Sequence, residues 1–368
     1  MTVEVRLQHS FGDFRLDAEF AAGMGVTALF GPSGSGKSTV VNAVSGLLKP
    51  DAGRIVVGDD ILFDSAAGVA LPTWRRRIGY VFQDARLLPH LTVRQNLLFG
   101  RWLRRRDVTA AGTGAIALEH VVEVLNLGHL LGRRPGALSG GEKQRVGIGR
   151  ALLSCPRMLL MDEPLASLDH SRRLEVLDYL NRIRHELKLP VLYVTHSLDE
   201  VMRLADQVVL FKDGRTISQG APADVLNRHR DAFDGAAEAP GTLLETRIVA
   251  HDAKYGLTEL AVNGSDAIRL RVPRASGEPG DACRILVRER DVAVATAPPV
   301  DTSVLNVLSA RVTTLRDLGD SVEVGATLLG DCAGTVLRAR ITRFSADQLQ
   351  LVTGREVYLL VKSVALTR

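Results

Sequence analysis

The sequence predicts an α/β domain followed by an all-β tail. Up to about residue 230, apolar runs typical of buried parallel strands alternate with segments whose apolar residues recur at helical spacing. From residue 243 onward, short apolar runs such as 356–361 follow a period of two. A small, acidic, proline-terminated stretch at 231–241 separates the two patterns and is typical of a linker.

Composition limits the class of protein. The chain has 368 residues, enough for two domains, and its 46% hydrophobic content excludes a largely disordered protein. The net charge, 46 − 42 = +4, is too small to indicate nucleic-acid binding, so no nucleic-acid partner is expected. The arginine clusters at 75–77 and 104–106 are interpreted as solvated surface.

Cysteine usage and hydropathy bear on location. Cys155, Cys283 and Cys332 show neither metal-ligand spacing nor an even framework, which favours a reduced, cytoplasmic setting. The first residues alternate apolar and polar, unlike a signal peptide, and no segment reaches the ~18 unbroken apolar residues of a membrane span. We therefore expect a soluble chain.

Composition and pattern divide the chain into four parts: an α/β domain at 1–235, a linker at 236–242, and two β units at 243–298 and 299–368. A loose internal repeat relates the two β units. Two small barrels of the oligonucleotide/oligosaccharide-binding (OB) kind would explain this repeat. The segments 246–248, 269–272 and 280–287 run in the same order as 310–312, 338–341 and 354–361.

A P-loop follows the predicted strand at 26–30. Lys37 is expected to reach the β- and γ-phosphates of a nucleotide, and backbone N–H groups at the start of the next helix are expected to cradle the phosphates. The glycines let the backbone approach the ligand closely. The segment comprises Gly31, Pro32, Ser33, Gly34, Ser35, Gly36, Lys37, Ser38 and Thr39.

A second glycine-rich stretch, Ser139, Gly140 and Gly141, opens another predicted helix but has no lysine of its own. A Ser-Gly-Gly turn at a helix start is likewise built to face phosphate. We therefore expect it to hold the γ-phosphate of a nucleotide bound by another subunit.

Two adjacent carboxylates follow the predicted strand at 157–161. Asp162 and Glu163 would be costly there without a cation, so we assign Asp162 to a Mg²⁺ shell and Glu163 to the attacking water, as general base or polarising group. His196 follows the strand at 191–195 and is expected to contact the γ-phosphate. Open α/β sheets bind ligands at the carboxyl ends of their strands, where all three residues fall.

The expected Mg²⁺ shell consists of oxygen atoms. Mg²⁺ prefers near-octahedral oxygen ligands and keeps several waters. The predicted ligands are the Ser38 hydroxyl, two phosphate oxygens, waters and Gln83, and Asp162 is expected to act through a water.

The order and spacing of these elements resemble the ATP-binding cassette (ABC) family. Lys37 and Gln83 are 83 − 37 = 46 residues apart, and Glu163 and His196 are 196 − 163 = 33 apart. The resemblance covers residues 1 to about 230. It implies ATP and Mg²⁺ as cofactors, ATPase activity, and a homodimer in which two cassettes sandwich two ATP molecules.

The resemblance also assigns single residues. It implies that His196 is the family's switch histidine and that Asp169, in Ser167-Leu168-Asp169, links one ATP site to the other across the dimer. An aromatic side chain near the first strand usually stacks on adenine in this family, and Phe11 and Phe14 are both placed for it. A plain core role is the alternative for either phenylalanine.

Residues 79–97 carry the glutamine loop of import cassettes. Leu87, Leu88 and Leu91 are expected to line a groove for a helix of an integral membrane permease subunit. Fused spans, a second cassette and a coiled-coil insertion are all missing from the sequence, which favours an importer that depends on a periplasmic binding protein. The chain is then expected to be peripheral, on the cytoplasmic face of the inner membrane.

Segments 82–87, 138–153 and 162–169 look closest to the ATP-binding subunits of bacterial molybdate importers, and the tail resembles a molybdate-binding (Mop) domain at 302–308 and 362–364. Leu305 stands where an arginine is common, which removes a bidentate donor. For Ser303 and Lys362, turn and surface roles are the alternative. The residues implied in binding molybdate or tungstate are Ser303, Asn306, Lys362 and Ser363.

Two functions fit these observations. The first is an ATPase subunit that powers molybdate uptake. The second is an ATPase subunit for another cargo, such as sulfate, a sugar or a polyamine, with the tail as a regulatory or docking module. The cargo site is expected on other subunits, so the sequence leaves the cargo open.

Overall fold

The computed structural model describes residues 2–103, 116–166, 168–186, 189–229, 241–262, 268–275, 277–330, 334–362 and 364–366. The chain forms two compact units, Met1–Val225 and Leu226–Arg368. The predicted linker lies largely outside the described residues, and the domain boundaries proposed above stay predictions. None of the described helices has the length and apolarity that a membrane span requires.

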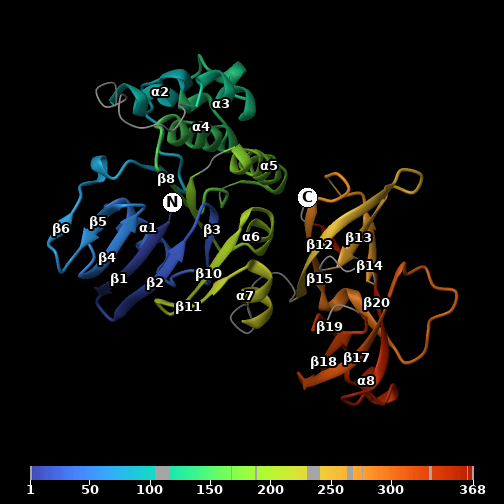
Figure 1. Cartoon of the computed structure of the whole chain (residues 1–368). Helices are drawn as coiled ribbons and strands as arrows, with labels where there is room; N and C mark the ends of the chain where they lie inside the picture. Colours follow the sequence, from blue (N-terminus) through green and yellow to red (C-terminus); the bar gives the residue numbers. More distant parts are fainter. Residues whose placement is uncertain are drawn as a thin grey trace. The chain divides into compact units, whose positions relative to one another are not determined.

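The first unit is built on one mixed sheet (Figure 1). Its strands are β1 (Val3–Phe11), β2 (Phe14–Ala22), β3 (Gly25–Phe30), β4 (Ala52–Val57), β5 (Asp60–Asp64), β6 (Val69–Ala70), β7 (Ile78–Val81), β8 (Met158–Asp162), β9 (Pro190–Thr195), β10 (Gln207–Lys212) and β11 (Arg215–Gly220). They follow the order β6-β5-β4-β1-β2-β11-β10-β3-β9-β8-β7.

The half of this sheet that carries the predicted site is parallel. Strand β3 pairs in parallel with β10 and β9, and β8 pairs in parallel with β9 and β7. All six residues of β9 are buried, as expected for a strand covered on both faces. The P-loop, Gln83, Asp162 and His196 therefore all lie at the carboxyl ends of neighbouring strands.

Helices cover this sheet and form a separate layer beside it. In Figure 1, α2, α3 and α4 lie together, and α4 also contacts β7 of the sheet. Gly149 permits their close packing, since a Cβ there would come within 2.7 Å of Leu97 Cδ2. The helices are α1 (Lys37–Ser45), α2 (Val93–Leu103), α3 (Leu118–Val124), α4 (Gly140–Leu153), α5 (His170–Glu186), α6 (Leu198–Leu204) and α7 (Pro222–Arg228), with 3₁₀ turns at Thr73–Arg75, Gly128–Leu130 and Pro135–Ala137.

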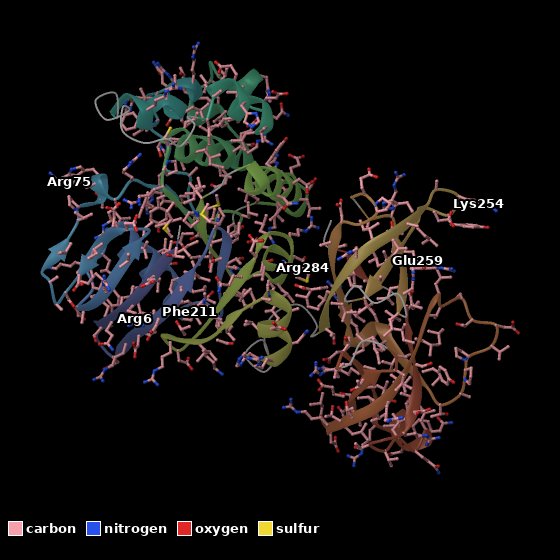
Figure 2. The ribbon with its side chains drawn as sticks, viewed as in Figure 1. Arg6, Arg75, Phe211, Lys254, Glu259 and Arg284 are labelled. Atoms are coloured by element: carbon pink, nitrogen blue, oxygen red, sulfur yellow. The ribbon has the colours of Figure 1, made fainter. Side chains whose placement is uncertain are left out.

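The interpretation of the arginine run at 75–77 as solvated surface is wrong for Arg76. Arg75 projects from the surface (Figure 2), but Arg76 is only 3% exposed. Its guanidinium donates to the carbonyl oxygens of Ala43 (2.7 Å) and Val44 (2.9 Å) at the end of α1, and to that of Leu71 (2.8 Å). A cation at a helix C-terminus satisfies carbonyls that lack an intrahelical partner, which explains its burial. Arg104–Arg106 lie outside the described residues.

The second unit consists of two five-stranded antiparallel sheets. The first has the order β14-β13-β12-β15-β21 and the second β16-β20-β17-β18-β19. The elements are β12 (Gly241–Asp252), β13 (Leu257–Val262), β14 (Arg269–Pro273), β15 (Ala282–Arg288), a 3₁₀ turn at Glu289–Asp291, β16 (Val292–Ala295), β17 (Asn306–Asp317), β18 (Ser321–Leu328), β19 (Val336–Thr342), α8 (Arg343–Gln348), β20 (Glu356–Val361) and β21 (Ala365–Leu366).

The internal repeat is visible in this topology. Strands β12 to β15 and β17 to β20 have the same spatial order, third-second-first-fourth, and the repeated sequence segments fall on equivalent strands. Even the irregularities match, because the ladder shifts between Ile248 and Ala250 in β12 and between Val312 and Thr314 in β17. The predicted α/β domain and all-β tail are thus confirmed.

The two tail sheets exchange strands. Strand β16, which precedes the predicted division at 298, pairs with β20 in the second sheet, and β21 pairs with β15 in the first. One hydrophobic core, which includes Leu260 and Leu359, is shared by both sheets. Hydrogen bonding therefore crosses the proposed division of the tail.

Candidate ATP site

The P-loop joins β3 to α1. Gly36 caps the N-terminus of α1 in the left-handed region (φ 96°), and a Cβ there would come within 2.7 Å of Leu16 Cδ1. A Cβ at Gly31 would collide with the carbonyl oxygen of Phe211. These close approaches explain why glycine is needed at both positions. The helix start that they shape presents N–H groups suited to an anion.

Lys37 lies at the first position of α1 and is 4% exposed. Its ammonium group donates to the carbonyl oxygens of Gly31 (2.8 Å) and Pro32 (2.7 Å). Burial lowers the pKa of Lys37, and the negative charges of Glu163 and Asp162 oppose this shift. The loop thus curls around one cation that the two carboxylates face.

Asp162, at the end of β8, is bound to residues from two other elements. Its Oδ1 accepts a 2.9 Å hydrogen bond from the Ser38 hydroxyl, and its Oδ2 lies 3.3 Å from the hydroxyl of Tyr80 on β7. Burial raises the pKa of Asp162, whereas the hydrogen bonds from Ser38 and Tyr80 lower it. Tyr80 also lies 3.1 Å from Asn42 Oδ1, so α1, β7 and β8 meet at this carboxylate.

Glu163 and His196 contact each other. His196 Nδ1 lies 3.2 Å from Glu163 Oε1, across the neighbouring ends of β8 and β9. Glu163 adopts a positive φ of 42°, uncommon for a non-glycine residue, and its backbone N–H donates to the Val194 carbonyl (3.1 Å). Strained backbone of this kind clusters at functional sites, because the surrounding structure must hold it.

The Ser139-Gly140-Gly141 turn forms a capping box at the start of α4. Ser139 Oγ accepts from the Glu142 N–H (3.3 Å), and Glu142 Oε2 accepts from the Ser139 N–H (2.6 Å). The hydrogen bond from the Ser139 backbone is the largest cause that lowers the pKa of Glu142. Because the Ser139 hydroxyl accepts in this box, its own hydrogen can point away from the helix.

Asp169 lies beside the same turn. Asp169 Oδ1 accepts from the Arg172 N–H (3.0 Å), and Arg172 packs against Gly141, where an added Cβ would be 3.4 Å from its Cδ. The sequence placed Asp169 and the glycine-rich turn at separate points of the chain, and the structure brings them together. Ser167 lies outside the described residues.

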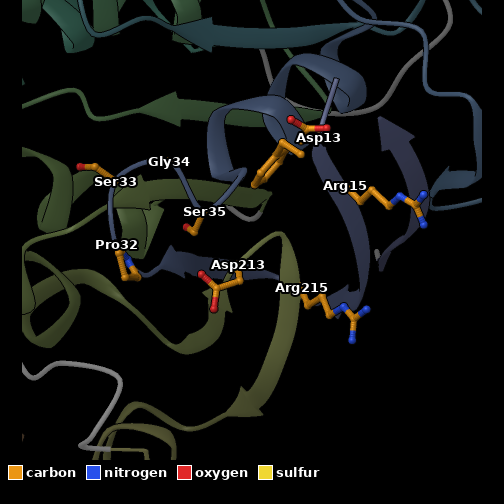
Figure 3. Close-up of a pocket in the computed structure, with 9 residues that line it drawn as sticks. Asp13, Arg15, Pro32, Ser33, Gly34, Ser35, Asp213 and Arg215 are labelled. Carbon is orange, nitrogen blue, oxygen red and sulfur yellow. The ribbon is translucent and has the colours of Figure 1, made fainter. Parts of the chain in front are cut away.

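A pocket of about 440 Å³ adjoins the P-loop. Phe14 lines it, whereas Phe11 is 49% exposed and packs edge-on against His9. Figure 3 shows Pro32, Ser33 and Ser35 on one side of the pocket, and Arg15 and Arg215 on the other. Of the two predicted aromatics, the structure places Phe14 next to the phosphate-binding loop.

The residues assigned to Mg²⁺ fit that ion in part. The Ser38 hydroxyl and the Asp162 carboxylate contact each other, and oxygen atoms are the ligands that Mg²⁺ prefers. Gln83 is exposed two residues beyond β7, and among the described residues no hydrogen bond joins it to Ser38. Burial and the charge of Glu163 raise the pKa of Asp162, and the positive charge of Lys37 offsets only part of this rise. A bound cation would therefore stabilise the ionised carboxylate.

The sequence analysis did not predict three residues whose hydrogen bonds connect the glutamine loop to the site. Arg150 of α4 donates to the carbonyl oxygens of Ala85 (3.0 Å) and Arg86 (2.9 Å), and Gln144 of the same helix donates to Phe82 (3.3 Å). Tyr80 is the third. Their signal in the sequence is weak, since a polar residue on a helix or strand is ordinarily assigned to the solvated face.

The predicted oxyanion residues of the tail lie near one end of the β17–β20 pair. Asn306 is 6% exposed and bridges the two sheets: its Nδ2 donates to the Arg271 carbonyl (2.9 Å), and its Oδ1 accepts from the Arg271 N–H (2.6 Å). Within the described part of the chain, the second hydrogen of this amide has no acceptor. Ser303 and Lys362 are exposed, Leu305 is 58% exposed, and Ser363 lies outside the described residues.

Comparison with known proteins agrees with this geometry. Residues 16–166 match the ABC transporter family, and residues 302–367 match the TOBE domain. A nucleotide-free ATP-binding cassette from an ABC transporter superposes with a TM-score of 0.52 at 27% identity, over 63% of this chain and 96% of that one. The ADP conformation of another cassette gives 0.51 at 27%, over 64% and 99%.

The fold and site therefore define an ATP-binding cassette ATPase. Proteins named molybdenum import ATP-binding protein ModC are similar over the full chain: that of Mesorhizobium japonicum is 45% identical over 370 residues, covering 100% of this chain and 96% of its own, and that of Rhizobium meliloti is 45% identical over 366 residues, covering 100% and 99%. The chain belongs to the ABC transporter family, as an ATP-binding protein with a TOBE domain. The predicted family is confirmed.

Proposed function

We propose that this chain is the ATP-hydrolysing subunit of an ABC importer that takes up molybdate. The observation that supports molybdate as the cargo is the 45% identity to molybdenum import proteins, which extends across the tail as well as the cassette. The observation that carries the chemistry is the meeting of Lys37, Ser38, Asp162, Glu163 and His196 at adjoining strand ends.

ATP binding begins at the P-loop. The Lys37 ammonium exchanges the Gly31 and Pro32 carbonyls for β- and γ-phosphate oxygens, which carry more negative charge. The N–H groups at the start of α1 receive the remaining phosphate oxygens. Phe14, from the adjoining pocket, offers a ring face to the adenine, with Phe11 as the alternative.

Ser38, Asp162 and Gln83 would hold Mg²⁺. The Ser38 oxygen would be a direct ligand, and Asp162, which accepts the Ser38 hydrogen bond, would act through a water. When bound, the ion neutralises charge on the phosphate oxygens. Gln83 would have to move toward Ser38, as its place in an exposed loop permits.

Hydrolysis uses Glu163 and His196. The Glu163 carboxylate orients and polarises a water toward the γ-phosphorus and receives its proton. The water oxygen bonds to the γ-phosphorus as the bond to the β–γ bridging oxygen breaks, and the products are ADP and phosphate. His196 Nδ1 lies 3.2 Å from Glu163 Oε1, and when ATP is bound the imidazole N–H would turn to the γ-phosphate oxygens and help to place the water. The two side chains come from neighbouring strand ends, so the sheet fixes their separation.

The complete site requires two chains. Ser139, Gly140 and Gly141 have their phosphate-facing groups on a helix whose own chain binds ATP elsewhere, so the ATP they contact is the partner's. Asp169, bound to the Arg172 that packs on Gly141, senses this engagement. The cassettes thus act as a homodimer around two ATP molecules.

Membrane partners complete the importer. Leu87, Leu88 and Leu91 are half-buried beside α2 and offer apolar surface to a helix of a permease subunit, which receives molybdate from a periplasmic binding protein. The cassette then lies on the cytoplasmic face of the inner membrane. The tail would bind molybdate or tungstate through Ser303, Asn306, Lys362 and Ser363, and thereby report the cytoplasmic level.

Reconstitution with the permease tests the proposal. Proteoliposomes that contain the chain, its permease and the binding protein are expected to take up radiolabelled molybdate only with ATP, at a rate proportional to hydrolysis. Sulfate, a sugar and a polyamine serve as alternative cargoes in parallel vesicles. Uptake of one of these without molybdate uptake would assign the ATPase to that cargo instead.

A further inference from the structure

A buried carboxylate lies next to the catalytic residues and takes no part in the mechanism above. Glu200, on α6, is 4% exposed. Burial of a carboxylate is costly unless hydrogen bonds compensate for the lost water. Glu200 lies four residues after His196, on the helix that follows this histidine.

The partners of Glu200 come mainly from β9. Glu200 Oε2 accepts hydrogen bonds from the hydroxyls of Tyr193 (2.9 Å) and Thr195 (2.7 Å). Arg173 Nε of α5 lies 4.0 Å from Oε1. Burial raises the pKa of Glu200, and the bonds from Thr195 and Tyr193 oppose that rise. The carboxylate therefore joins α6 to the end of β9 through two hydrogen bonds.

Only one of these partners also reaches the backbone around His196. The Thr195 hydroxyl, which donates to Glu200, accepts a 3.0 Å hydrogen bond from the Ser197 N–H. Thr195 and Ser197 flank His196 on its two sides. Tyr193, two residues earlier in the buried strand, donates to the same carboxylate, and among the described residues its hydroxyl makes no hydrogen bond to this turn.

We propose that Glu200 is a positioning residue for His196, acting through the Thr195 hydroxyl. The relay from Glu200 to Thr195 to the Ser197 N–H fixes the turn in which the imidazole faces Glu163, 3.2 Å away. This inference rests on the proposed ATPase function. It adds that the orientation of His196 is set by a buried carboxylate on the following helix.

A matched pair of variants tests the relay. Thr195→Val and Tyr193→Phe each remove one hydroxyl donor from the same carboxylate oxygen, but only the first also releases the Ser197 N–H. For Thr195→Val we expect kcat to fall about tenfold or more with KM for ATP nearly unchanged, because small displacements of a catalytic group are costly. Tyr193→Phe is expected to keep kcat within about twofold.

The conservative variant Thr195→Ser keeps the hydroxyl and is expected to restore kcat, and Glu200→Ala is expected to reproduce the Thr195→Val defect. Thermal midpoints and binding of a fluorescent ATP analogue, measured for all four full-length proteins, show whether each variant folds. If Thr195→Val does not fold, the comparison of Glu200→Ala with Tyr193→Phe decides: a kcat loss in Glu200→Ala alone supports the relay, and equal kcat values refute it.

Two outcomes overturn the inference. The first is an equal loss of kcat in Thr195→Val and Tyr193→Phe at equal thermal midpoints, which would make the network a packing feature. The second is wild-type turnover in Glu200→Ala. Neither result resembles a failure of the proposed function, which would appear as absence of ATP hydrolysis in the wild-type protein.

Discussion

The hydroxyl of Ser38 donates a 2.9 Å hydrogen bond to Asp162 Oδ1 across 124 residues of sequence. The bond joins the first turn of α1 to the end of β8, so it fixes the position of the phosphate-binding loop relative to Asp162. In the proposed function, the neighbouring Glu163 then faces the γ-phosphate. Substitutions at this point should separate ATP binding from ATP hydrolysis.

Glu163→Gln is expected to lower ATP turnover at least about 100-fold while ATP still binds, because the amide keeps the shape but receives no proton. The protein should then accumulate as a dimer with trapped ATP, measurable by size-exclusion chromatography with light scattering. Lys37→Ala, the matched variant, should lose binding itself. Loss of both binding and dimerisation in Glu163→Gln would contradict the role assigned to Glu163.

Ser139→Arg is expected to abolish turnover without loss of ATP binding to the P-loop, because the bulky cation blocks the partner's phosphate site at the start of α4. Without permease, wild-type activity should rise faster than linearly with protein concentration. The capping box makes Ser139→Thr the suitable control, since threonine also caps helices. Activity strictly linear down to verified monomer would exclude the two-chain site.

Arg76→Met is expected to destabilise the first unit by about 2–4 kcal/mol, because three carbonyl oxygens lose a charged donor. Arg75→Met, one residue earlier on the exposed surface, should change stability by less than about 0.5 kcal/mol. Denaturant unfolding followed by an ATP-binding signal measures both. Equal effects would mean that the guanidinium contacts contribute little.

Glu142 gives a pH-dependent contribution to stability. Its folded-state pKa lies below the ordinary 4.5, so the contribution is fully present above 4.5 and is lost as pH falls through the folded-state value. Thermal midpoints of the wild type and Glu142→Gln should therefore differ at pH 7 and converge below pH 4.5. The exposed Glu123→Gln is the control, and an unchanged Glu142 difference at low pH would contradict the sign.

Leu305→Arg is expected to tighten molybdate binding to the full-length protein about tenfold or more, because a guanidinium adds directed, charge-assisted hydrogen bonds of about 1.5–3 kcal/mol each. Titration calorimetry with molybdate and with sulfate measures the change, and Leu305→Lys tests whether charge alone suffices. If neither the wild type nor Leu305→Arg releases heat with molybdate, the tail has a structural role only.

The sequence predicted those parts of the site that short segments encode. The P-loop, the Asp162-Glu163 pair and the Ser-Gly-Gly turn each combine residue type with position after a strand or before a helix, and these local signals are strong. Arg76 and Glu200 were missed for the opposite reason. A charged residue reads as exposed unless its burial is known, and only the tertiary structure shows the carbonyls and hydroxyls that compensate it.

The tail shows the same limit at the level of topology. Period-two patterns predicted its strands, and the repeat predicted two similar small barrels. No local pattern indicates that β16 and β21 each join the other half. Asn306 is a further case, because its link to the Arg271 backbone depends on how the sheets meet. Long-range pairing is set by the shared core rather than by neighbouring residues.

The exchange of β16 and β21 also has a consequence during synthesis. On the ribosome, residues 241–288 emerge well before 365–366, which supply the edge strand of the same sheet. Until then the edge of β15 stays open, and an open strand edge is a template for pairing with another nascent chain. The first unit ends at residue 225 and can fold early, whereas the first sheet of the tail is complete only when residues 365–366 have been made. Newly made chains are therefore most exposed to aggregation while the tail is still incomplete.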